Sequence, residues 1–302
     1  MIAGAGASVE PSPAPAGNSS RTLPAPLLDL AATVDGGQSF RWWPEDGGYR
    51  GVLDDRLLRL SKSGAALAIE PLDGLPAGDL TDGVARYLDL GFDLDALRAR
   101  HLTDSHLLQA MKRHRGLRVL RQDPWETLVA FICSSTSSIP RIKRDVASLA
   151  RTYGHRVGSG TDDFSFPGPS TLANAPEADL RELGLGFRAP FVIGAAQAVD
   201  TGRLALPELR AAPYYEARAA LTDLRGVGEK IADCVLAFSL DKGEAVPVDR
   251  WVRRALVEWY GMPPNMNNSN AALWARRRFG ADGAYVGQYL FHGRRLAGRK
   301  QA

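Results

Sequence analysis

The segment from Leu224 to Cys234, together with the later run Val246-Pro-Val-Asp249, constrains the fold of this chain more than any other feature. Gly226 and Gly228 permit a sharp turn whose backbone N–H groups stay open, the arrangement that receives a phosphate at a helix N-terminus. Lys230 follows in the first helical turn, and the cysteine that ends the segment lies four residues later on the same face. The pattern predicts two helices joined by a tight glycine turn. A plain helical hairpin with a solvated lysine is the simplest alternative.

Length and composition place the chain among ordinary globular proteins. Its 302 residues, 45% hydrophobic and 24% charged, can bury a full core and suggest about two domains. Two cysteines, Cys133 and Cys234, exclude a disulfide framework and a four-cysteine iron–sulfur or zinc site. No apolar run approaches the length of a membrane span. We therefore expect a protein of a reduced intracellular compartment that does not engage membranes.

Charge is unevenly distributed along the chain. The net charge is +3, but residues 250–302 hold ten Lys and Arg against Glu258 and Asp282, so this part carries +8 and the rest carries −5. Such asymmetry favours a nucleic-acid partner at the C-terminal end. A solvated basic face is the alternative.

The N-terminal third divides into a tail and a β-containing domain. Residues 1–22, rich in Ala, Gly, Pro and Ser, predict a disordered tail and carry no signal-peptide pattern. A domain over residues 23–118 follows, with turns predicted at Asp54-Asp55 and Ser63-Gly64. The expected antiparallel meander consists of strands at Gln38–Trp42, Tyr49–Leu53, Arg56–Leu60 and Ala66–Glu70.

Helical signals dominate from residue 79 onward. Asp123 is placed to cap a helix with Pro124 at its first position, and Glu126 would complete a capping box. Pro140 opens another helix, for which Gly154 is a plausible stop. We therefore predict an α+β fold, in which a mainly α-helical domain over residues 119–302 follows the β-containing domain.

Six short motifs follow one another along the chain: Gly37-Gln-Ser-Phe-Arg-Trp42, Leu120-Arg-Gln-Asp-Pro124, Phe131-Ile-Cys-Ser-Ser135, Leu183-Gly-Leu-Gly-Phe-Arg188, Gly226–Cys234 and Val246-Pro-Val-Asp249. Their order and spacing resemble those of the 8-oxoguanine DNA glycosylase/AP lyase family, in the helix-hairpin-helix (HhH-GPD) superfamily. The resemblance runs from about residue 28 to residue 296. Any one motif is weak, but six in the family's order are specific.

The resemblance implies covalent chemistry at a lysine. Lys230 matches the nucleophile that displaces the damaged base and holds the sugar as a Schiff base, from which β-elimination cleaves the strand. Partial burial and nearby positive charge keep part of such an amine neutral. Asp249 matches the carboxylate that stabilises the cationic sugar and assists proton transfer. Alternatively Asp249 caps a helix beginning at Arg250, and both roles can coexist.

The resemblance also implies a pocket for the lesion base. The backbone carbonyl of Gly37 matches the acceptor for the N7–H of oxidised guanine, and Cys234 and Gln288 match further pocket residues. Phe291 and His292 compete for the position of the base-stacking ring. Gly226 and Gly228 match the hairpin's phosphate contact, and the hairpin cation of the family would be held by the backbone carbonyls of three residues: Thr222, Leu224 and Val227.

On the opposite strand, Arg141 and Arg188 match arginines that bind the orphaned cytosine, and Phe187 matches an aromatic wedge that kinks DNA. Two departures stand out. Thr136 occupies the place of an asparagine that helps fill the gap left by the extruded base. Trp251 replaces a histidine and can neither accept a hydrogen bond nor become cationic, so the sequence leaves the phosphate contact at this position open.

The sequence thus predicts a monomeric, bifunctional enzyme that excises 8-oxoguanine from duplex DNA and needs no cofactor. A related glycosylase for alkylated or mismatched bases is one rival, which the motif at residues 37–42 disfavours. A non-catalytic DNA-binding hairpin protein is another, disfavoured by the presence of both Lys230 and Asp249. Dinucleotide binding is poorly supported, because no third glycine follows Gly226 and Gly228 at the required spacing.

Overall fold

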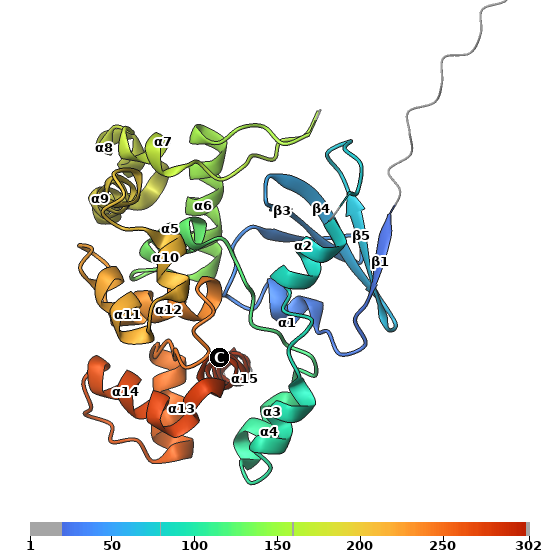
Figure 1. Ribbon diagram of the computed structural model, residues 1–302, viewed down its shortest axis with the longest axis vertical. Helices are drawn as coiled ribbons and strands as arrows, with labels where there is room; N and C mark the ends of the chain where they lie inside the picture. Colours follow the sequence, from blue (N-terminus) through green and yellow to red (C-terminus); the bar gives the residue numbers. More distant parts are fainter. Residues whose placement is uncertain (1–19, 79, 159, 300–302) are drawn as a thin grey trace, which may run out of the picture.

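A computed structural model describes residues 20–299 apart from residues 79 and 159 (Figure 1). A five-stranded antiparallel sheet near the N-terminus is followed by a large helical region, which confirms the predicted α+β class. No described helix combines the length and the apolar composition that crossing a bilayer requires. Most of the predicted tail, residues 1–19, lies outside the described residues.

The strand order in the sheet is β1-β5-β4-β3-β2, with every neighbouring pair antiparallel. The predicted turn at Asp54-Asp55 is confirmed, because both residues have positive φ, at 47° and 58°, between β3 and β4. The strands are β1 (Arg21–Pro24), β2 (Trp42–Glu45), β3 (Gly48–Leu53), β4 (Arg56–Ser63) and β5 (Ala66–Pro71).

Two predictions about this region were wrong. Residues 38–41 are not a strand, because the buried side chain of Gln38 binds the loop carbonyls of Thr33 and Arg118 instead of extending the ladder. Residues 21 and 22 are not part of a disordered tail, because β1 pairs with β5 along the sheet edge.

The helical region wraps around one helix, α12, whose residues from Ile231 to Ser239 are all buried. In Figure 1 α12 lies among α5, α11 and the orange and red C-terminal helices, and it packs on α5, α11 and α14. The helices are α1 (Leu30–Val34), α2 (Leu80–Tyr87), α3 (Leu94–Arg100), α4 (Ser105–Arg113), α5 (Pro124–Cys133), α6 (Ile139–Tyr153), α7 (Pro169–Ala173), α8 (Glu177–Leu180), α9 (Ala189–Asp200), α10 (Leu206–Ala211), α11 (Tyr214–Thr222), α12 (Glu229–Ser239), α13 (Arg250–Tyr260), α14 (Asn268–Phe279) and α15 (Gly283–Arg299), with short turns η1 (Arg181–Leu185), η2 (Gly186–Arg188) and η3 (Gly280–Asp282).

The predicted helix signals are largely confirmed. The Asp123 carboxylate accepts from the Glu126 N–H at 2.8 Å, and Pro124 is the first residue of α5. The reciprocal half of the capping box is absent among the described hydrogen bonds, because the Glu126 carboxylate lies 3.6 Å from Arg41. Gly154 ends α6, where a Cβ would lie 2.0 Å from the carbonyl oxygen of Ser165.

Two hydrophobic clusters form the core. The smaller packs the sheet against α1 and α2 through residues such as Trp42, Leu60 and Val84. The larger fills the helical region and also takes in Leu97 of α3 and Leu107 of α4. By packing, α3 and α4 therefore lie with the helical region, although the sequence places them in the N-terminal domain.

The contact between α4 and α15 joins two histidines. His114 and His292 meet edge to face, with ring centroids 4.3 Å apart. Burial, with smaller contributions from the neighbouring His114 and Arg295, lowers the pKa of His292 to about 3. Burial also lowers the pKa of His114. Both rings therefore pack as neutral imidazoles between the two helices.

We expect His292→Phe to weaken the acid sensitivity of folding. The folded pKa of His292, about 3, lies below its unfolded value of about 6.5, so the unfolded chain binds the proton first. Stability contributed by the neutral ring is complete above the unfolded pKa and declines as the pH falls towards the folded pKa. Urea midpoints of wild type and variant between pH 7.5 and pH 5 test this, with the exposed His155→Gln as control. Parallel pH profiles would contradict the assignment.

Candidate active site

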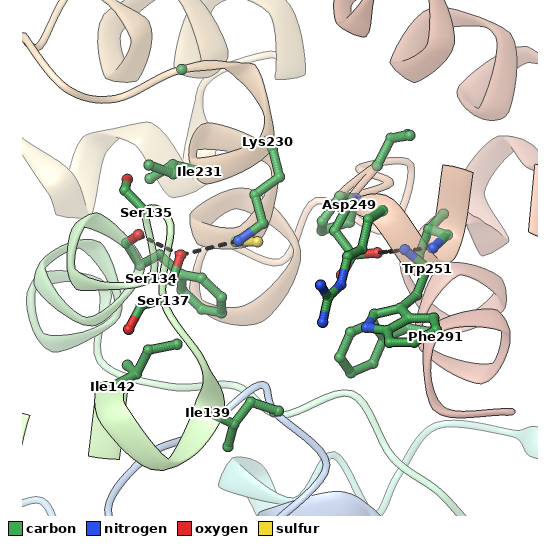
Figure 2. Close-up of a pocket in the computed structure, with 18 of the residues that line it drawn as sticks. Ser134, Ser135, Ser137, Ile139, Ile142, Lys230, Ile231, Asp249, Trp251 and Phe291 are labelled. Atoms are coloured by element: carbon green, nitrogen blue, oxygen red, sulfur yellow. Dashed lines mark hydrogen bonds between the residues drawn. The ribbon is translucent and has the colours of Figure 1, made fainter. Parts of the chain in front are cut away.

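A cavity of about 1060 Å³ opens between the N-terminal end of α12, the start of α13, α15, the connection from α5 to α6, and the loop that holds Gly37. Figure 2 shows Lys230 and Asp249 on opposite sides of this cavity, with Ile139 and Ile142 below and Phe291 beside Trp251. The structure therefore brings together residues from segments about 250 positions apart, as the motifs of the sequence implied.

Lys230 lies in the first turn of α12 and points into the cavity. Its Nζ donates to Ser134 Oγ at 3.1 Å and lies 5.1 Å from the ring centroid of Phe131. Ser134 ends α5 and donates its own proton to the Phe131 carbonyl at 2.6 Å. Ser134 thus holds the amine, a role that sequence reasoning missed although Ser134 stands within one of the quoted motifs.

Asp249 is the N-cap of α13. One carboxylate oxygen accepts from the N–H groups of Trp251 at 2.9 Å and Val252 at 2.8 Å. Burial raises the pKa of Asp249, while the bond from Val252 and the charge of Lys230 oppose the rise. The capping role is therefore present, and the helix N-terminus holds the carboxylate on the wall opposite Lys230 (Figure 2).

Four of the predicted base-pocket residues line the cavity: Gly37, Cys234, Gln288 and Phe291. Cys234 is buried, and this burial raises the pKa of its thiol to about 12 despite a hydrogen bond and positive charge from Lys230. The buried Nε2 of Gln288 has no hydrogen-bond partner among the described residues. Gly37 has φ +91°, and a Cβ there would lie 2.7 Å from Ile139 and 3.3 Å from Phe291. Only glycine fits this position, so its backbone faces the cavity.

The structure separates the two candidates for the stacking ring. Phe291 lines the cavity, next to Gly37. His292 does not line it; the ring is 94% buried against His114 of α4. The proposal of His292 as a pocket residue is therefore corrected, because successive helical positions differ by about 100° in direction.

The hairpin places open backbone at the mouth of the cavity. Gly226 has φ +86°, and a Cβ there would lie 2.4 Å from the ring of Phe191. Gly228 precedes α12 as its N-cap without a side-chain cap, so the first N–H groups of this described helix face outward for an anion. The carbonyl of Leu224 accepts from the Val227 N–H at 3.0 Å.

The residues predicted to contact the opposite strand differ in how exposed their side chains are. Phe187 is 53% exposed, as a wedge requires, and Thr136 is exposed with an unusual φ of +51°. Arg141 is half-exposed and donates to the Gly184 carbonyl at 2.9 Å. Arg188 is buried, unlike the half-exposed Arg141.

Each of the three guanidinium nitrogens of Arg188 makes a hydrogen bond within the protein. The guanidinium donates to the carbonyls of Leu185 (2.9 Å), Gly184 (3.0 Å) and Cys133, and lies 3.1 Å from Asp145. A direct contact with an unpaired cytosine would require these bonds to rearrange. In this structure Arg188 holds the turn between η1 and α9.

Two arginines of the helical region lie against aromatic rings. Trp251 lines the cavity, and the guanidinium of Arg250 lies 4.8 Å from its ring centroid. The guanidinium of Arg276 lies 4.3 Å from the ring centroid of Tyr214 and 4.2 Å from that of Tyr215. Arg276 therefore does not belong to the exposed basic surface that its neighbours Arg277 and Arg278 share.

Comparison with known proteins agrees with this architecture. Residues 22–128 match the N-terminal domain of 8-oxoguanine DNA glycosylases, and residues 129–276 match the HhH-GPD superfamily of base excision DNA repair proteins. The N-glycosylase/DNA lyase of Saccharomyces cerevisiae is 34% identical over 272 residues, covering 80% of this chain and 70% of the yeast protein. The probable N-glycosylase/DNA lyase of Methanothermobacter thermautotrophicus is 28% identical, covering 91% and 96%.

Solved structures show the same fold. The 8-oxoguanine glycosylase/lyase of Clostridium acetobutylicum, bound to duplex DNA with cytosine opposite 8-oxoguanine, aligns with a TM-score of 0.84 at 28% identity and covers 90% of this chain and 93% of that one. MBOgg1, solved with a low affinity DNA ligand, gives 0.87 at 32% identity, with coverage of 94% and 97%. The chain belongs to the 8-oxoguanine DNA glycosylase family of the HhH-GPD superfamily.

Proposed function

We propose that this protein is a bifunctional DNA glycosylase that excises 8-oxoguanine from duplex DNA and then cleaves the strand by β-elimination. The observation that carries the proposal is the placement of Lys230 and Asp249 on opposite walls of one cavity, which Gly37, Gln288 and Phe291 also line (Figure 2). A base inside a duplex stack cannot reach such a pocket, so the damaged nucleotide must be extruded.

The chemistry follows from this placement. The neutral amine of Lys230 attacks C1′, the bond from C1′ to the base breaks, and the base leaves with a proton. The carboxylate of Asp249 stabilises the positive charge that develops on the sugar. Loss of a proton from nitrogen and opening of the ring give the imine. Removal of a proton from C2′ then expels the 3′ phosphate, and water hydrolyses the imine to regenerate the amine.

Selectivity for oxidised guanine resides in backbone and amide groups. The Gly37 carbonyl would accept the N7–H that normal guanine lacks. The unpartnered Nε2 of Gln288 would bind the Watson–Crick edge of the extruded base, and the ring of Phe291 would stack on it. Unpaired buried polar groups make a site reject ligands that cannot satisfy them.

DNA is held from outside the cavity. The open N-terminus of α12 after Gly228 would bind a phosphate, and Phe187 would fill the stack beside the extruded nucleotide. A cation at the carbonyls of Thr222, Leu224 and Val227 would strengthen the hairpin, and each carbonyl keeps a lone pair for it. We further propose that the monomer acts where the genome lies, the nucleoid of a bacterium or the nucleus of a eukaryote.

The similarity to glycosylases for alkylated bases extends only to the fold. The 3-methyladenine DNA glycosylase of Archaeoglobus fulgidus aligns with a TM-score of 0.74 but at 22% identity, which shows a shared fold alone. The match of residues 22–128 to the N-terminal domain of 8-oxoguanine glycosylases favours oxidised guanine. Release of 8-oxoguanine and of alkylated bases from matched duplexes would separate the two activities.

We expect Lys230→Gln to abolish covalent trapping. Borohydride reduces a Schiff base to a stable amine, so wild type should become linked to duplex DNA that carries 8-oxoguanine. The variant lacks the amine, and its DNA affinity should persist because phosphate contacts dominate binding. The exposed Lys112→Gln serves as control and should trap like wild type. Trapping that survives in Lys230→Gln would refute the assignment.

Asp249→Asn separates charge from capping. Asparagine caps helices as well as aspartate does, so α13 should keep its N-terminus and the melting temperature should hold. Loss of the carboxylate charge should slow single-turnover base release by about 100-fold or more. A near-normal rate with normal stability would leave Asp249 with a capping role alone.

Thr136→Asn should sharpen the preference for cytosine opposite the lesion. Thr136 lacks the amide of the family's asparagine, and every guanidinium nitrogen of Arg188 already bonds to the protein, so wild type should also act opposite other bases. One recognition contact is worth about 1–3 kcal/mol, which predicts a gain in discrimination of about ten-fold. Excision rates on four duplexes measure it.

The matched control for this experiment is Thr136→Gly. Position 136 has φ +51°, which both asparagine and glycine tolerate better than the β-branched threonine. Glycine relieves the backbone without adding an amide. Equal discrimination in the Asn and Gly variants would show that backbone strain, and not base readout, governs this position.

A further inference from the structure

The loop over residues 35–41, between α1 and β2, forms the wall of the cavity that holds Gly37. The loop contains no helix or strand, so side-chain hydrogen bonds must fix its shape. The location of the Gly37 carbonyl depends on how firmly this loop is held, because a hydrogen bond weakens steeply when its geometry is lost.

Gln38 fixes the middle of the loop. Its side chain is 1% exposed, donates to the carbonyls of Thr33 (3.0 Å) and Arg118 (2.7 Å), and accepts from the Leu120 N–H at 3.0 Å. Its carbonyl accepts from Gln122 at 2.7 Å. These bonds tie the loop to its own domain and to the segment before α5. They do not tie it to α6, which forms the neighbouring wall.

Lys143 of α6 supplies that link. Its side chain is buried, and Nζ donates to the Asp35 carboxylate and to the Trp42 carbonyl at 2.7 Å each. The two acceptors stand at opposite ends of the loop. Nζ also lies 5.0 Å from the ring centroid of Trp43. A buried ammonium is costly unless it is paired, so this charge holds both loop ends in place.

The link acts directly beside the cavity. Ile139 and Ile142 project into the cavity from the first turn of α6, as Figure 2 shows, and Lys143 is the next residue of that helix. Gly37 fits so closely against Ile139 that a Cβ there would lie 2.7 Å away. A shift of α6 relative to the loop would therefore move the Gly37 backbone. Lys143 itself is not among the residues that line the cavity.

We propose that Lys143, with Asp35, is a positioning residue for lesion recognition: it locks the Gly37 loop onto α6 and so sets where the Gly37 carbonyl meets the extruded base. The inference rests on the proposed function. It assigns Lys143 no contact with DNA and no part in bond breaking. It therefore predicts a defect confined to the step that reads the base.

Two substrates separate this role from a general loss of structure. Lys143→Met should lower single-turnover excision of 8-oxoguanine opposite cytosine by about ten-fold, equivalent to about 1.4 kcal/mol of misplaced recognition. Strand cleavage at a preformed abasic site in the same duplex needs Lys230 but no base, and should stay within about two-fold of wild type. Asp35→Ala, at a less buried position, should reproduce the defect.

The double variant and a control sharpen the result. Because both residues act through one link, Lys143→Met with Asp35→Ala should lose little more than either alone. Lys62→Met is the matched control, since Lys62 also donates to a backbone carbonyl, that of Gly64, but at an exposed sheet turn. It should behave as wild type on both substrates.

Two results would overturn the inference: equal loss of excision and abasic-site cleavage in both variants, or normal excision in both. Failure of the proposed function looks different, since wild type itself would then release no 8-oxoguanine. That result would contradict both the proposed function and the role of Lys143. An active wild type whose variants lose excision and abasic-site cleavage equally would contradict only the role of Lys143.

Discussion

Burial of α12 is the constraint on which the rest of the site depends. This helix carries Lys230 and Cys234 towards the cavity, and between them along the helix stands Asp233, which is fully buried. The Asp233 carboxylate accepts from the Tyr214 hydroxyl at 2.7 Å and lies 3.6 Å from Arg218. Burial raises the pKa of Asp233 to about 7 in spite of these partners. If α12 rotated, this carboxyl group would lie in the core without its partners. The polar contacts therefore fix which face of α12 meets the DNA.

Around that helix, polar groups fall into two kinds. Some bond to groups of the protein itself, as Arg188 and Gln38 do, and these shape the walls. Others are left open, such as Nε2 of Gln288 and the N-terminus of α12. An open polar group in a rigid wall gains a hydrogen-bond partner only when a ligand binds. A ligand that cannot supply the partner leaves the group unpaired and therefore binds more weakly, which makes the site selective.

The cavity also depends on contacts between the two parts of the chain. The Gly37 loop comes from the N-terminal part, while Ile139 and Phe291 come from the helical part; a Cβ at position 37 would lie 2.7 Å from Ile139 and 3.3 Å from Phe291. Neither part holds a complete lesion pocket. The reactive pair, Lys230 and Asp249, lies within the helical region alone. In the proposed function, recognition of the base also requires the Gly37 loop of the N-terminal domain.

The sequence by itself determined what depends on neighbouring residues: the glycine turn before Lys230, the Asp123 cap, the meander with its Asp54-Asp55 turn, and the α+β order. Turn dihedrals and caps are short-range, so a few residues encode them. Only the tertiary structure decided that Phe291 lines the cavity while His292 packs on α4, and that Arg188 is buried.

The link from Lys143 to Asp35 spans 108 residues, and Ser134 reaches Lys230 across 96. Such pairings follow from how whole helices pack. Adjacent side chains on a helix point about 100° apart, so a distant helix covers one and leaves the other open. Which one it covers depends on how the two helices pack, and no local sequence pattern encodes that.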